Sequence, residues 1–473
     1  MRRTLNKIAF VAFMAALPIL AQAGTLAARI DALFTESAAT KRTNMSLKVA
    51  DVESGKVLYD RAGDVLFTPA SNLKIYTSSA VLDEFGSAHR FQTLIGFEGF
   101  MREHRLGGNL VIKGGGDPMF SSDDLRSLAR RVRTDLGIAE IGGDIVVDVS
   151  LFGLPLKGPG WMWDDDPDGY NMSIAAMMMD FNVMTVQIAP AATKGAGSLI
   201  VPPPVVSLAP AAEFPRLRVD IAAGTETNVT VTRKPFTEDI LVTGTWAGAD
   251  AATTQTLTMH DPAPWIGAVF IEMLREEGVA VEGGVRVSRE PVSVTPLLAH
   301  DSRPLGEAIR RFNKVSENAI GEMLLHDLGV VRSKVPSTWP AGATIISEWL
   351  VDRAGLEKGS FRLVDGSGLS RYNLISADSS IRLLRYMWKH REKQSFFDSL
   401  PVYTVTLSDG KQEQRVHAKP GGMAAVSTIS GYIQRTDGRW LVYSFLANGY
   451  IGTPADVRAL REKVYTALAE STD

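Results

Sequence analysis

Apolar and polar residues alternate on both sides of two short turns, one near each end of the chain. Residues 46–59 do so around Ser54-Gly55, and residues 426–446 do so around 436–438. Since successive side chains of a strand point to opposite faces of a sheet, both patterns predict β-hairpins. Near the C-terminus, residues 456–469 carry apolar side chains at helical spacing and predict a helix that docks on the core.

The long middle of the chain mixes the two periods. A helix pattern at 122–133 lies between strand patterns at 109–112 and 144–149. Residues 188–255 are rich in Val, Thr, Pro and Ala with short alternating runs, which predicts a small β domain. One further strand is predicted at 279–287. No repeat of fixed period is present.

Three short motifs follow one another: Ser71-Asn-Leu-Lys74, Ser316-Glu-Asn318 and Lys419-Pro-Gly421. Each is weak alone, but their order and contexts favour a serine nucleophile activated by lysine. A helix opening near Ser71 would let Lys74, three residues on, reach back to the hydroxyl. A buried lysine near a second cation loses its charge and can accept the serine proton. The alternative is an N-cap at Ser71 and a solvated Lys74.

The other two motifs supply the remaining candidate catalytic groups. Ser316 is expected to relay a proton from Lys74 or Lys419 to the leaving group, and Asn318 to orient Lys74 and hold a substrate carbonyl. Lys419 would supply positive charge and help keep Lys74 neutral. The alternatives are a helix N-cap at Ser316 and a solvated strand lysine at Lys419.

At these residues the chain resembles the class C low-molecular-mass penicillin-binding proteins of the peptidase S13 type, which are D-alanyl-D-alanine carboxypeptidases and endopeptidases. Similar segments stand at 110–118, 160–165 and 365–371. The resemblance implies an α/β (α+β) fold. A split transpeptidase/β-lactamase-like domain with an antiparallel sheet and helices carries an inserted mixed domain, which carries a small β domain. The expected parts are a signal peptide at 1–23, the catalytic domain at 24–87 and 299–473, the inserted domain at 88–187 and 256–298, and the nested β domain at 188–255.

The third motif departs from the family pattern, which reads Lys-Thr-Gly followed by Thr or Ser. Here Pro420 replaces the threonine and Gly422 replaces the next hydroxyl residue, which resembles the binder of a terminal carboxylate. A strand tolerates Pro420 only where the lost N–H was unpaired. The Gly422 N–H remains and is expected to complete an oxyanion hole with that of Ser71. We therefore expect weakened recognition of a terminal D-alanine carboxylate and a preference for cross-link cleavage.

The resemblance also implies that four residues border the substrate: Asp164, Asp165, Ser367 and Gly421. The two aspartates lie in a Trp-Met-Trp-Asp-Asp-Asp cluster, and they are expected to bind the amine of a diaminopimelate-type stem residue. An acidic surface loop with buried tryptophans is an equally favoured interpretation. Asp365-Gly-Ser-Gly predicts a tight turn beside the cleft.

Composition and the N-terminal segment exclude several classes of function and indicate where the protein is located. A net charge of −3 over 473 residues gives no basic field for nucleic acid, and the absence of cysteine excludes disulfides and a thiol nucleophile. The seven histidines form no metal signature, and we expect no cofactor. Arg2, Arg3 and Lys7, an apolar stretch at 8–20 and Ala21-Gln-Ala23 predict a signal peptide cleaved after Ala23, and hence a periplasmic protein without a stable membrane anchor. An uncleaved anchor is the alternative.

These observations predict a periplasmic serine D,D-peptidase that cleaves D-alanyl bonds in peptidoglycan through an acyl-enzyme at Ser71. Its expected partners are stem peptides and cross-links, with β-lactams as inhibitors. Two other classes stay open: a catalytically impaired peptidoglycan-binding scaffold, and an esterase or β-lactamase on the same fold. The sequence decides neither carboxypeptidase against endopeptidase activity nor the oligomeric state.

Overall fold

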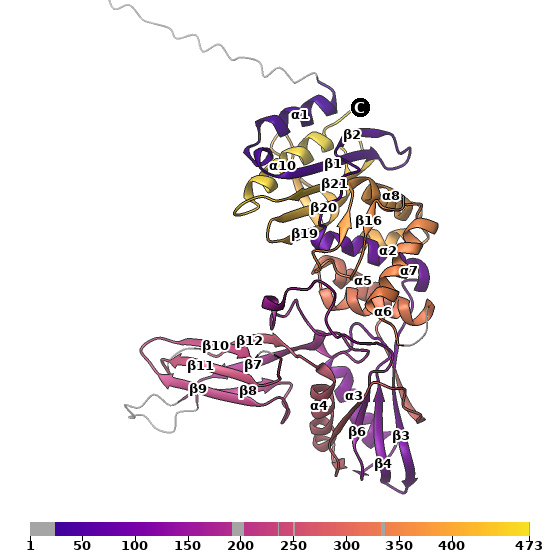
Figure 1. The fold of residues 1–473 in the computed structure, drawn as a ribbon, viewed down its shortest axis with the longest axis vertical. Coiled ribbons are helices and arrows are strands. Elements are labelled where there is room, and N and C mark those ends of the chain that lie inside the picture. The colour runs from indigo at the N-terminus through magenta and orange to yellow at the C-terminus, as the bar shows by residue number, and fades with distance from the viewer. Residues whose placement is uncertain (1–23, 192–202, 235, 249–250, 333–335, 473) are drawn as a thin grey trace, which may run out of the picture.

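The structure is a computed structural model that describes residues 24–191, 203–234, 236–248, 251–332 and 336–472. The predicted signal peptide lies outside these residues. The molecule is elongated, and a flat arm of strands projects from its lower half (Figure 1). No helix among the described residues is long and apolar enough to cross a bilayer.

One end of the molecule is built on a six-stranded antiparallel sheet that brings the two ends of the chain together. Both predicted hairpins are confirmed as neighbouring strand pairs in it. The sheet order is β18 (Val402–Thr406), β19 (Gln412–Met423), β20 (Val426–Gln434), β21 (Trp440–Asn448), β1 (Asn44–Asp51) and β2 (Val57–Arg61).

Helices cover both faces of this sheet. The terminal helices α1 (Leu26–Glu36) and α10 (Ala455–Ala469) pack side by side on one face (Figure 1), as the apolar spacing of the C-terminal segment predicts. On the other face lie α8 (Ala377–Trp388) and the 3₁₀ turn η2 (Ala70–Leu73), which runs directly into α2 (Lys74–Phe85).

A layer of helices surrounds α2 beside the sheet. Residues 74–82 are all buried, because α2 packs against its neighbours on every side. Ser78 and Ser79 satisfy their buried hydroxyls by donating to carbonyls one turn back. The surrounding helices are α5 (Leu305–Lys314), α6 (Asn318–Arg332), α7 (Trp339–Asp352) and α9 (Lys393–Ser399).

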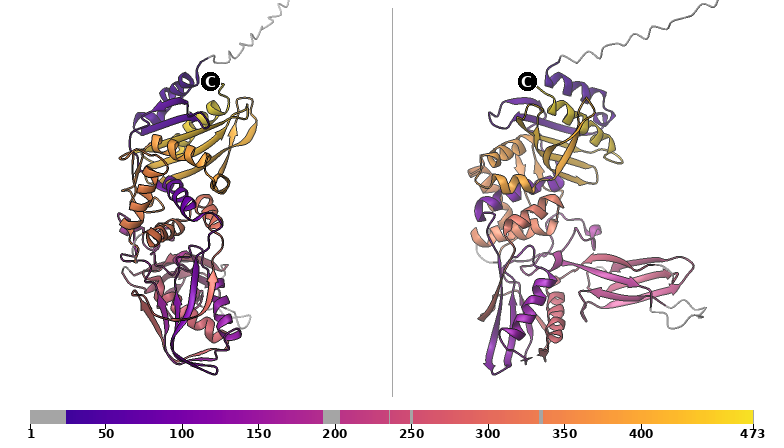
Figure 2. Two further views of the ribbon diagram at one scale, coloured as in Figure 1. Left: turned by 90° about the vertical axis from the view of Figure 1, so that its right-hand side faces the viewer. Right: turned by 180° about the vertical axis from the view of Figure 1, so that it is seen from behind.

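The other end of the molecule is a seven-stranded sheet on which α3 (Ser122–Thr134) and α4 (Pro262–Glu276) pack (Figure 2). The strand predicted at 279–287 is two short strands, and between them Gly283 lies against the Gly143 backbone, where a Cβ would collide. The strands are β3 (Gln92–Arg102), β4 (Arg105–Lys113), β5 (Glu140–Ile141), β6 (Ile145–Asp148), β13 (Ala280–Val281), β14 (Val285–Ser288) and β15 (Thr295–Asp301).

The arm consists of two three-stranded sheets (Figure 2), and its strands β7 and β12 extend beyond the predicted segment 188–255 on either side. The parallel pairing of β9 with β11 is not visible in the alternating pattern, which is the same for parallel and antiparallel strands. The sheets are β10-β11-β9 (Asn228–Arg233, Ile240–Trp246, Leu217–Ala223) and β12-β7-β8 (Thr253–Thr258, Val183–Ala189, Val205–Ala209).

Candidate active site

Ser71 and Lys74 lie where the six-stranded sheet, called the upper sheet below, meets the layer of helices around α2. The Lys74 side chain is fully buried, and its Nζ lies 3.0 Å from Ser71 Oγ. Nζ also contacts Asn318 Oδ1 at 2.7 Å and the Ser367 carbonyl oxygen at 2.9 Å. No side-chain hydrogen bond caps α2, so the interpretation of Ser71 as an N-cap with a solvated Lys74 is wrong.

The environment of Lys74 disfavours its charge. Burial lowers the pKa of the Lys74 amine to about 8, against the opposing effect of the Glu322, Asp365 and Glu317 carboxylates. As a neutral amine, Lys74 can donate two hydrogen bonds to Asn318 and Ser367. It can then accept the third from the Ser71 hydroxyl, which is the geometry that a general base needs.

A second buried lysine approaches the same place from the sheet. Lys419 is 1% exposed, and its Nζ lies 3.0 Å from Ser316 Oγ, so the alternative of a solvated strand lysine is wrong. Burial, with a smaller contribution from the charge of Lys74, lowers the pKa of Lys419 to about 6. The charge of Lys74 therefore makes the charged form of Lys419 less favourable.

Ser316 and Asn318 are positioned by the start of α6. Ser316 has a left-handed backbone with φ 65°, which is uncommon for a residue with a Cβ and is found in strained functional segments. Asn318 is the first residue of α6 and donates from Nδ2 to the Tyr170 carbonyl at 3.0 Å. Asn318 therefore joins Lys74 to the loop that leads into the arm.

The third motif lies on the open edge of the upper sheet. Strand β18 pairs with β19 only as far as His417, and the Ala418 N–H makes a last bond to Pro401 on that side. Because N–H directions alternate along a strand, positions 420 and 422 also face this edge, away from β20. Pro420 therefore removes no ladder bond, and the Gly422 N–H is aimed at the side where β19 borders the cleft.

The two glycines of this motif differ in their surroundings. A Cβ at Gly421 would collide with the Pro69 carbonyl oxygen, so β19 and η2 approach too closely for any side chain there. A Cβ at Gly422 would find its nearest neighbour 3.9 Å away, at the Val426 carbonyl oxygen. A hydroxyl side chain at position 422 would therefore fit without a clash.

A cleft of about 590 Å³ opens in front of these groups. Ser367 and Gly421 are not in its lining: Ser367 is fully buried below it and meets Lys74 through its carbonyl. The lining contains residues of all three motifs together with residues of the segments 162–170 and 368–371. It consists of Ser71, Met162, Asp164, Asp165, Tyr170, Ser316, Asn318, Gly368, Leu369, Arg371, Gly422, Met423 and Ala424.

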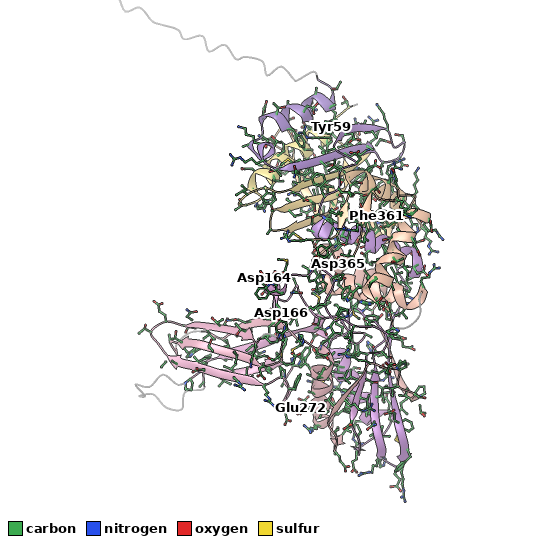
Figure 3. All side chains as sticks on the ribbon, viewed as in Figure 1. Tyr59, Asp164, Asp166, Glu272, Phe361 and Asp365 are labelled. Carbon is green, nitrogen blue, oxygen red and sulfur yellow. The ribbon has the colours of Figure 1, made fainter. Side chains whose placement is uncertain are left out.

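The two predicted amine-binding aspartates lie in the short turn η3 (Trp163–Asp165) at the rim of this cleft. Asp164 is exposed on the side from which the arm projects (Figure 3), and Asp165 accepts a 2.8 Å hydrogen bond from Tyr170. Trp161 is partly buried and donates from Nε1 to Asp365 at 3.0 Å, whereas Trp163 is 83% exposed. The structure thus supports elements of both interpretations of the cluster.

Comparison with known proteins decides the family. The model of the D-Ala-D-Ala carboxypeptidase 3 (S13) family matches residues 26–470. The chain belongs to this family. The S13 resemblance read from the motifs is confirmed.

Two relatives show how far the similarity extends. The D-alanyl-D-alanine carboxypeptidase of Actinomadura sp. (strain R39) is 32% identical over 468 residues, covering 93% of this chain and 84% of the relative. The D-alanyl-D-alanine carboxypeptidase DacB of Haemophilus influenzae is 25% identical and covers 86% of each chain. The crystal structure of penicillin binding protein 4 (dacB) from H. influenzae has a TM-score of 0.79, with 23% identity, and covers 93% of this chain and 99% of that one. The predicted mixed α/β fold with antiparallel sheets and helices is confirmed.

This S13 protein also uses residues that the sequence analysis missed. Asn72, inside the first motif and fully buried, donates to the Lys419 carbonyl at 2.6 Å and accepts from Ser430 at 3.0 Å. It therefore fixes the strand of the third motif to the turn of the first. Glu322, on α6, is likewise fully buried. For Glu322, a charged residue in the otherwise apolar run 319–325 was the signal; for Asn72 it was its place inside the first motif.

Proposed function

We propose that this chain is an exported serine D,D-peptidase that cleaves D-alanyl peptide bonds of peptidoglycan through an acyl-enzyme at Ser71. The observation that carries the proposal is the buried Lys74 amine, 3.0 Å from Ser71 Oγ and with a pKa lowered by burial. Membership of the S13 family and the names of its relatives support this substrate class.

In the acylation step Lys74 takes the Ser71 proton while Oγ bonds to the carbonyl carbon of the D-alanyl bond. The backbone N–H groups of Ser71 and Gly422 receive the oxyanion. When the C–N bond breaks, the proton passes from Lys74 through the Ser316 hydroxyl, held by Lys419, to the leaving amine. Water then attacks the ester and regenerates Ser71.

The same proposal covers location and organisation. Cleavage after Ala23 would release the chain just before α1 and deliver it to the periplasm. β-lactams would acylate Ser71, because they mimic the D-alanyl peptide. The catalytic domain would comprise 24–87 and 299–473, the inserted domain 88–187 and 256–298, and the nested β domain 188–255. The ordered contacts around Ser71 favour an active enzyme over a scaffold.

The proposal is tested with purified mature protein and two muropeptides: a cross-linked dimer and a monomer that ends in D-alanyl-D-alanine. Liquid chromatography with mass spectrometry measures the released monomer and D-alanine. Wild type should release at least one of them, and Ser71→Ala should release neither. A folded wild type that converts no substrate would support the scaffold alternative, and an active Ser71→Ala would exclude Ser71 as nucleophile.

A further inference from the structure

The loop Asp365–Gly368 is held tightly between the two helices that carry the catalytic groups. On one side, a Cβ at Gly366 would collide with the Gly321 carbonyl oxygen of α6. On the other, Gly368 has φ 86°, and a Cβ there would collide with the Ala70 carbonyl oxygen of η2. Backbone meets backbone at both contacts, so the loop fills the space between α6 and the turn that carries Ser71.

A buried carboxylate fixes this loop from below. Glu322 of α6 is 0% exposed, and its two oxygens accept the N–H groups of Gly366 at 2.7 Å and Ser367 at 2.8 Å. Thr77 of α2 donates to the Gly366 carbonyl at 2.7 Å. The next carbonyl, that of Ser367, accepts from Lys74 Nζ at 2.9 Å. The backbone of Ser367 thus links Glu322, which accepts its N–H, to the Lys74 amine, which donates to its carbonyl.

We propose that Glu322 is a positioning residue for the reaction: by fixing the Gly366 and Ser367 amides, it orients the Ser367 carbonyl that holds Lys74 in line with Ser71. This inference rests on the proposed function and adds to it a residue outside the three motifs. Glu322 does not line the cleft. It acts through the loop and through its charge.

The charge of Glu322 also affects Lys74. The groups that act on the Lys74 amine are the carboxylates of Glu322, Asp365 and Glu317, which raise its pKa, and burial, which lowers it. Lys419, whose own pKa is lowered to about 6, is the second amine at the site. Burial and the Asp365 carboxylate raise the pKa of Glu322, opposed by its two N–H donors and by Lys74. Because each Glu322 oxygen accepts an N–H group and the Lys74 amine is close by, the ionised carboxylate is the form that fits this geometry. Removing the carboxylate should therefore lower the pKa of Lys74 further.

The test is the rate of Ser71 acylation by penicillin as a function of pH, in wild type and Glu322→Gln. A glutamine oxygen can replace only one of the two acceptors, so the Ser367 carbonyl loses its fixed position. We expect the alkaline plateau to fall by about tenfold or more. The midpoint of the acid limb should shift to lower pH, because Lys74 becomes neutral earlier. Loss of structural support alone would lower the plateau without moving the midpoint.

Two further variants make the result decisive. Glu322→Asp keeps the charge but shortens the reach, so it should lower the plateau and keep the wild-type midpoint. Asp327→Asn, which replaces a buried carboxyl group of the same helix that lies beside Gly116, should change neither. Thermal unfolding followed by circular dichroism confirms that each variant is folded. If Glu322→Gln does not fold, the Glu322→Asp profile decides.

An unshifted midpoint in folded Glu322→Gln, or a wild-type plateau in Glu322→Asp, would overturn the role of Glu322. Failure of the proposed function looks different, since wild type itself would then show no acylation at any pH.

Discussion

The floor and the rim of the cleft are built on opposite principles. In the floor, the charged groups of Lys74, Glu322 and Asp365 are fully buried, and each makes two or more hydrogen bonds to fixed partners. At the rim, Asp164 and Arg371 are exposed, and Arg371 reaches one carbonyl, that of Ala424, at 3.2 Å. The floor fixes the positions of its buried side chains and shifts the pKa values of Lys74 and Glu322. The rim instead presents hydrated charged side chains to a ligand.

This difference separates chemistry from recognition. A charge in the floor has already lost its water, so its protonation state depends on its neighbours. A charge at the rim loses water only when a substrate binds, so its contribution appears as selectivity between substrates. Substitutions in the floor should therefore affect every substrate, and those at the rim only some.

The largest expected effect belongs to the floor. Lys74→Met should slow acylation by penicillin by about 10²- to 10⁴-fold, because the general base is lost. In wild type, a Lys74 pKa of about 8 predicts a roughly tenfold rise in acylation rate from pH 7 to pH 9, as the amine becomes neutral. Trp163→Ala, at the exposed rim, is the matched control and should acylate at the wild-type rate. Stopped-flow or quench measurements that found equal rates in Lys74→Met and wild type would remove Lys74 from the mechanism.

The next effect concerns the rim. Asp164→Asn or Asp165→Asn should lower cleavage of stem peptides with a free side-chain amine by about ten- to a hundredfold relative to N-acylated ones. A lost charge-assisted hydrogen bond costs roughly 1.5–3 kcal/mol. Competition between the two peptides in one reaction gives the ratio directly. An equal loss on both peptides would reduce the aspartates to supports of their loop.

A third effect shows what the floor costs in stability. The pKa of Lys419 is about 6 in the folded protein against 10.5 normally, so the unfolded chain binds the extra proton between these values and stability rises with pH there. Lys419→Met should therefore be more stable than wild type at pH 7, by about 1–3 kcal/mol, and the gain should shrink towards pH 9. Thermal unfolding at both pH values measures it. A destabilised Lys419→Met at pH 7 would show that its bond to Ser316 outweighs the cost of burial.

The smallest effect concerns the altered third motif. Gly422→Ser adds a hydroxyl where there is open space, so release of terminal D-alanine should rise a few-fold relative to cross-link cleavage, by about 1 kcal/mol. Pro420→Thr should change either rate by less than about twofold, since position 420 faces the open edge of the sheet. Assays of both reactions on the two single variants and the double variant test this. A parallel rise in both reactions would contradict the assigned role of position 422.

The sequence predicted the elements and the convergence of the three motifs better than it predicted the contacts that support them. Both hairpins and the helix after Ser71 follow from local periodicity, and the three motifs converge as expected. Glu322 accepts hydrogen bonds from the amides of Gly366 and Ser367, which follow it in the sequence by 44 and 45 positions. No local pattern in the sequence encodes a contact over such a distance. Strand β19 tolerates Pro420 because β18 stops pairing with it at His417, so that no partner strand needs an N–H at position 420. The end of this pairing is visible only in the assembled sheet.

The central claim is that the floor makes Ser71 a nucleophile, and mass spectrometry of the intact mature protein after incubation with penicillin tests it most directly. The account predicts one covalent adduct in wild type, mapped by peptide digestion to Ser71, and no adduct in Ser71→Ala. Wild-type protein that is folded but carries no adduct, or an adduct that persists in Ser71→Ala, would contradict it.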